Sequence, residues 1–84
     1  MKSLIVAVRD QKSVTFTQPV TVPTKGMALR SWGDQLSDPA NANQEQAKHP
    51  EDFSLWIIGE FDDNTGEITP QKPEQLAVAS DLKR

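Results

Sequence analysis

The stretch FSLWIIGEF, residues 53–61, decides the fold, because it is the strongest strand signal in the chain. Apolar side chains alternate along it with the period of two that a β-strand produces. Trp56 and Ile58 share one face of this predicted strand, and five residues share the other: Phe53, Leu55, Ile57, Gly59 and Phe61.

The segment DDNTG at residues 62–66 predicts a hairpin loop after this strand, with Gly66 at a positive φ and a return strand beginning over residues 67–69. Its carboxylates run consecutively and no helix precedes them, so the spacing of an EF-hand calcium loop fails. Residues 70–73 begin and end with proline, which predicts a break in the return strand. Residues 73–82 then form either a short helix or a final strand, and a proline followed by an acidic residue favours the helix.

Upstream, the apolar and β-rich residues 4–8 predict a strand over residues 3–9 that is covered on both faces. Alternating residues from 14 to 22 predict a second strand that returns along the first. Pro19 offers no backbone donor, so the far part of that strand must be an edge, a bulge or irregular.

A helix is predicted from Thr24, its N-cap, to about residue 37. Its apolar residues recur at helical spacing and form one stripe: Ala28, Leu29, Trp32 and Leu36. The order strand, strand, helix, strand, strand predicts an α+β domain in which two β-hairpins share an antiparallel sheet and the helix covers one face. A sheet completed only by a second chain is the alternative.

Residues 38–50 predict a mobile loop, since they are polar and follow no stable period. A short helical turn fits within this loop. His49, the sole histidine, stands beside Glu51 and Asp52, and these residue types are compatible with an acid–base or metal site. We interpret it as a loop histidine before a strand, with no metal, cofactor or catalytic residue.

The 84 residues allow one small domain, residues 1–84, with a thin core, because only 36% of them are hydrophobic. We therefore expect a homo-oligomer. Cysteine is absent, which excludes disulfides and thiolate sites. The apolar run at residues 4–8 is too short for a membrane span or a secretory signal, so we expect a soluble protein that stays in the compartment where it is made.

The net charge of −3 conceals a division between the two halves of the chain. Residues 1–37 hold five basic and two acidic side chains, whereas residues 38–84 hold four basic and ten acidic ones. A uniformly basic nucleic-acid binder is excluded, but a binder with one basic face is not. The candidate nucleic-acid-binding residues are four cations and one aromatic residue available for base stacking: Arg9, Lys12, Lys25, Arg30 and Phe16. A core position for Phe16 is the competing interpretation.

The segment KHPEDF at residues 48–53 resembles the small nonstructural protein of the gokushoviruses, single-stranded DNA bacteriophages within the microviruses. Blocks at residues 8–10, 24–32, 58–63 and 65–66 fit the same family in the same order, so nearly the whole chain is covered. Trp32 stands where the family leads us to expect phenylalanine, and residues 41–47 lie in a variable loop.

This resemblance implies a non-enzymatic protein that is made in the cytoplasm of the bacterial host and is absent from the mature capsid. It implies a part in single-stranded viral DNA synthesis, in replication or packaging, with single-stranded DNA as the expected partner. The alternative is an adaptor that binds a replication or procapsid protein without contacting DNA. No motif for a nucleophile, a phosphate loop or a paired-histidine metal site occurs, so we expect no enzyme.

Overall fold

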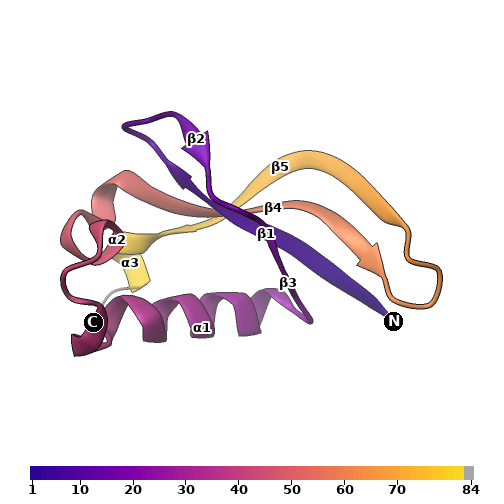
Figure 1. The fold of residues 1–84 in the computed structure, drawn as a ribbon, viewed down its shortest axis with the longest axis horizontal. Helices are drawn as coiled ribbons and strands as arrows, with labels where there is room; N and C mark the ends of the chain where they lie inside the picture. Colours follow the sequence, from indigo (N-terminus) through magenta and orange to yellow (C-terminus); the bar gives the residue numbers. More distant parts are fainter. Residues whose placement is uncertain (83–84) are drawn as a thin grey trace.

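The computed structural model describes residues 1–82, and its elements form the expected α+β domain (Figure 1). Three strands precede the main helix, the second and third being two short pieces of one broken segment, and two long strands follow it. In chain order the elements are β1 (Lys2–Asp10), β2 (Thr15–Phe16), β3 (Val20–Val22), α1 (Lys25–Ser37), the 3-10 turn η1 (Pro39–Asn41), α2 (Glu45–Lys48), the 3-10 turn η2 (Pro50–Asp52), β4 (Phe53–Asp62), β5 (Ile68–Val78) and α3 (Ala79–Leu82).

The five strands form one antiparallel sheet in the order β2-β1-β4-β5, and β3 pairs with β1 on the same edge as β2. The interruption between β2 and β3 contains Pro19, as the sequence predicted. Helix α1 runs along one face of the sheet (Figure 1). The prediction of two hairpins in a shared sheet with one covering helix is confirmed.

Helix α1 begins where the sequence predicts it, because the Thr24 hydroxyl accepts a hydrogen bond from the Met27 backbone N–H at 3.2 Å. Its apolar stripe is buried as expected, with Leu29 partly buried at the margin. The stripe meets the sheet in a single core whose buried members are Val6, Ala28, Trp32, Leu36, Phe53, Leu55, Ile57 and Ala79.

Strand β4 contains a bulge that the alternation of residues 53–61 does not reveal. Val6 pairs with Ile57 and Ile5 pairs with Gly59, so Ile58 is an extra residue on β4. After this bulge, the side chains of β4 that would have followed Phe53 point to the other face. Phe61 pairs with Ser3, and Ser3 lies on the side of β1 opposite Val6. The prediction that Gly59 and Phe61 share the face of Phe53 is therefore wrong, because Gly59 pairs with Ile5 on the side opposite Val6.

The hairpin loop after β4 is confirmed. Gly66 has a φ of 78°, and its N–H donates to the Asp62 carbonyl oxygen at 2.8 Å. The predicted break at residues 70–73 is confirmed in part: residues 71–73 have no partner in the pairing with β4, but β5 continues through both prolines to Val78. Both prolines are compatible with the sheet because β5 is an edge strand, where a missing backbone N–H need not remove a hydrogen bond to a neighbouring strand. The short C-terminal helix is present, but it covers only Ala79–Leu82.

Short helical turns occupy most of residues 38–50. Ala47 is buried, and the Gln46 side-chain oxygen accepts a hydrogen bond from the Trp32 indole N–H at 2.9 Å. This segment is thus attached to the core through α2. Its mobility stays a prediction.

Candidate nucleic-acid interface

One face of the sheet has no helix over it, and we call it the open face. On β1 the side chains of Leu4, Val6 and Val8 belong to the core beneath α1, so the alternate residues point to the open face. Cross-strand pairing extends this face over four strands, through Arg9, Phe16, Ser54, Trp56 and Gln75, while Ala7 on the same face is buried. A face of this kind is available for a ligand that lies across the strands.

Two aromatic side chains meet on the open face. The rings of Phe16 and Trp56 are 6.2 Å apart between centroids and are inclined at 82°, an edge-to-face contact. Phe16 is 44% exposed and Trp56 is half-buried. The Trp56 indole N–H donates to the Ser54 hydroxyl at 2.8 Å, which satisfies its polar group and fixes the ring. Exposed rings held in this way offer stacking surfaces for unpaired bases.

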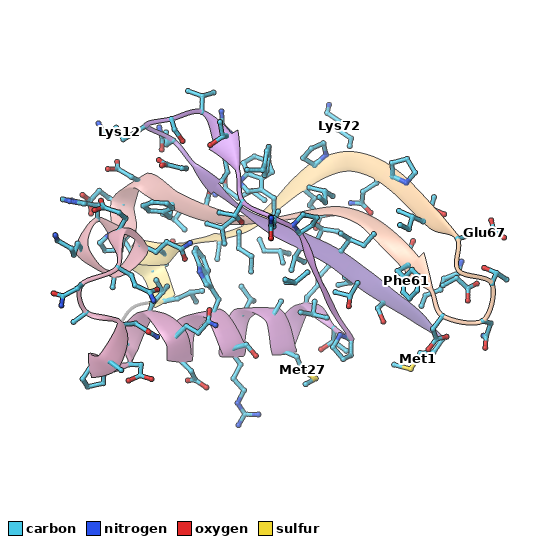
Figure 2. The ribbon with its side chains drawn as sticks, in the orientation of Figure 1. Met1, Lys12, Met27, Phe61, Glu67 and Lys72 are labelled. Atoms are coloured by element: carbon cyan, nitrogen blue, oxygen red, sulfur yellow. The ribbon has the colours of Figure 1, made fainter. Side chains whose placement is uncertain are left out.

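Two of the predicted cations belong to the hairpin that carries Phe16. Arg9 lies directly opposite Phe16 in the register of β1 and β2. Lys12 lies at the tip of the turn between these strands, on the side of the sheet away from α1 (Figure 2). The Asp10 carboxylate accepts a hydrogen bond from the Lys12 backbone N–H at 2.9 Å, which shapes the turn. Within residues 1–82, neither cation forms an ion pair.

The structure separates the other two predicted cations from this group. Lys25 and Arg30 lie on α1, in the layer beneath the opposite face of the sheet. The Lys25 ammonium contacts a Glu74 carboxylate oxygen at 3.1 Å, and Arg30 is exposed on the helix. A single basic face containing all the predicted residues does not form, because the sheet stands between the two layers.

The carboxylates of the strands avoid the open face. The register pairs Asp10 with Phe53, Glu60 with Leu4, Asp62 with Lys2 and Glu74 with Ile57. Each of these pairs lies on the α1 side, since it contains a core residue or alternates with one. The strand carboxylates therefore lie on the other face of the sheet from Arg9 and the aromatic pair. Lys12 instead borders a hollow that is also lined by acidic side chains: Asp10, Glu45, Glu51 and Asp52.

The sequence candidates omit Trp56, although the sequence contains a signal for it. The alternation places Trp56 on the face opposite Phe53, and a single helix covers only one face of a sheet. These two facts together predict an uncovered tryptophan. Lys72 was also omitted, because the predicted break at residues 70–73 hides its position on β5.

A second polar group lies at the end of the sheet near Lys12. Ligand atoms of His49, Glu51 and Asp52 lie within 4.8 Å of one another, and the His49 Nε2 atom is 3.9 Å from a carboxylate oxygen of Glu45. His49 and Glu51 are exposed. Exposed ion-pair contacts at these distances contribute little to the free energy of unfolding. We assign no site to this group.

A protein-family model described as Phage ORF5 protein matches residues 3–82. No curated protein and no solved structure matches the chain. In the described part of the chain, no helix combines the length and apolar character needed to cross a bilayer.

Proposed function

Since the chain belongs to the Phage ORF5 protein family, we propose that it is a non-enzymatic accessory protein of a gokushovirus that binds single-stranded DNA. It acts in the cytoplasm of the bacterial host during viral DNA synthesis, in replication or packaging. The contact of Phe16 with Trp56 on the open face, beside Arg9, is the observation that carries this proposal.

The chemistry of this face suits unpaired bases. A base can stack on an exposed aromatic ring only where no second strand holds it in a duplex, and such stacking is worth about 1–3 kcal/mol per base. Arg9 and Lys12 supply positive charge for the phosphates that accompany the stacked bases. Binding by stacking and charge alone requires no catalytic residue, metal or cofactor.

Self-association is part of the proposal, because one subunit offers only a small basic patch, Arg9 and Lys12. The outer edges of β5 and of the β2 and β3 segment have no strand partner within residues 1–82. Unpaired edges are sites where a second copy can add its own strand. Joining copies raises the effective concentration of each patch and so strengthens weak binding.

The proposal predicts salt-dependent binding of a labelled oligo-dT to the full chain. Fluorescence anisotropy at about 50 mM and about 200 mM salt should show affinity falling steeply as salt rises, because phosphate contacts release counterions. Phe16→Ala should weaken binding roughly tenfold, which corresponds to about 1.4 kcal/mol, within the range of one lost stacking contact. Phe16 is exposed enough that this variant should keep its fold, as circular dichroism can verify. Absence of binding at about 50 mM salt would refute the proposed function.

A protein adaptor is the second candidate, and one groove favours it. The groove, of about 250 Å³, lies between α1 and the β3 edge, and none of its lining residues is charged. Val20 at its margin is 59% exposed. An uncharged groove beside an open strand edge suits an extended segment of a replication or procapsid protein. Such an adaptor would show no salt-dependent affinity for DNA.

A further inference from the structure

Strand β5 leaves the regular sheet at one point. Gly59 pairs with Pro70 and Ile57 pairs with Glu74, so one residue of β4 stands opposite three residues of β5. We call these three residues, Gln71, Lys72 and Pro73, the β5 arch. Figure 1 shows β5 rising here on the side of the sheet away from α1. Extra residues in a strand redirect side chains, which commonly occurs beside binding sites.

The arch presents a cation to the side of the sheet that bears the aromatic pair. Figure 2 shows Lys72 directed away from α1, on the same side as Lys12. Lys72 is exposed and forms no ion pair with any described residue. Its neighbour Glu74 contacts Lys25 on the α1 side instead. The carboxylate nearest in sequence is therefore turned away from Lys72.

The open face thus has a cation on each side of its aromatic pair. Lys12 and Arg9 belong to the hairpin of β1 and β2, whereas Lys72 belongs to β5 at the other edge. Phe16 and Trp56 lie on strands between these limits, on β2 and β4. Three strand spacings separate β2 from β5, about 14 Å in all. Lys12 and Lys72 are also offset along the strands, because Lys12 follows Asp10, which pairs with Phe53, whereas the arch lies opposite Ile58. Stacked nucleotides rise about 3.4 Å each, so the crossing needs at least about four of them.

We propose that Lys72 on the β5 arch is a second phosphate contact, so that single-stranded DNA crosses the strands from the β1–β2 turn to the arch. This inference rests on the proposed function and adds a path and a footprint to it. The DNA bases stack on the aromatic pair at the centre of this path, and cations at both ends neutralise the DNA phosphates. The site accommodates at least about four nucleotides in each subunit.

Lys72→Glu tests this path in the full chain, with Arg30→Glu as the control of equal charge change on α1. Anisotropy with the same labelled oligo-dT should show roughly five- to tenfold weaker binding for Lys72→Glu at about 50 mM salt, and a slope of log affinity against log salt that is shallower by about 0.7. Arg30→Glu should change both quantities far less. Both residues are exposed, so both variants should fold.

Three results are distinguishable. A selective loss in Lys72→Glu supports the path. If the wild type binds DNA but Lys72→Glu behaves as Arg30→Glu does, the path is wrong and the proposed function stands. If the wild type does not bind, both are overturned.

Discussion

Trp32→Ala is expected to leave most of the protein unfolded at room temperature. Trp32 is only 5% exposed and lies in the centre of the single core, between Ala28 and Leu36 on the stripe of α1. Truncating a buried tryptophan to alanine costs about 3–5 kcal/mol, because the lost contacts leave a cavity. Small domains are stable by as little as about 5 kcal/mol, so this loss removes most of the free energy of unfolding.

The loss of stability in Trp32→Ala has a second source, the contact between Trp32 and α2. Its indole N–H donates to the Gln46 side chain, which attaches α2 to the core. Trp32→Phe is the matched control, since it keeps an aromatic ring but loses this hydrogen bond, at a cost of about 1 kcal/mol. Thermal denaturation followed by circular dichroism measures both variants. A melting temperature of Trp32→Ala within a few degrees of the wild type would contradict the helix register described above.

The double reversal Arg9→Glu with Lys12→Glu is expected to abolish most DNA binding. Arg9 lies opposite Phe16, and Lys12 lies in the turn of the same hairpin. Neither cation has an ion-pair partner within residues 1–82. Losing two phosphate contacts should weaken binding roughly fiftyfold at about 50 mM salt and make the salt slope shallower by about 1.4. Anisotropy with labelled oligo-dT measures both quantities.

Arg30→Glu with Lys48→Glu is the matched control, because it changes the net charge by the same amount from positions on α1 and α2. It should retain most of the affinity at about 50 mM salt. Equal losses in the two double variants would mean that net charge alone governs binding. Unchanged affinity in Arg9→Glu with Lys12→Glu would leave the adaptor as the better account.

Much of the fold follows from short-range patterns. The alternation in residues 53–57, the cap at Thr24 and the stripe through Trp32 each predict local structure that the fold contains. These signals succeed because the period of the apolar residues matches the element that buries them. Gly66 was predictable for a similar reason, since a tight hairpin loop needs a residue that tolerates positive φ.

Other features depend on pairing between distant segments and could not be predicted from local pattern. The extra residue Ile58 is visible only in the register of β4 against β1, yet it determines the face of Phe61. The prolines of β5 predict a break unless the strand is known to lie at an edge.

Only part of the candidate site could be predicted, because some of its residues come together through pairing between distant segments. Arg9, Lys12 and Phe16 are close in sequence and belong to one hairpin, so the fold brings them together. Lys25 and Arg30 belong to another layer, and neither composition nor charge counts reveal how layers stack. Trp56 joins Phe16 only through the pairing of β1 with both β2 and β4.

The most direct test of the account uses the two tryptophan indole N–H signals in the NMR spectrum of the 15N-labelled protein. Trp56 lies on the open face, where its N–H donates to Ser54, and Trp32 lies in the core beneath the sheet. The Trp32→Phe variant assigns the signals by removing one of them. On titration with a short oligo-dT, the account predicts that the Trp56 signal shifts or broadens while the Trp32 signal stays in place. A shift of the Trp32 signal alone, or no change in either signal at an excess of DNA, would contradict the open face as the DNA-binding surface.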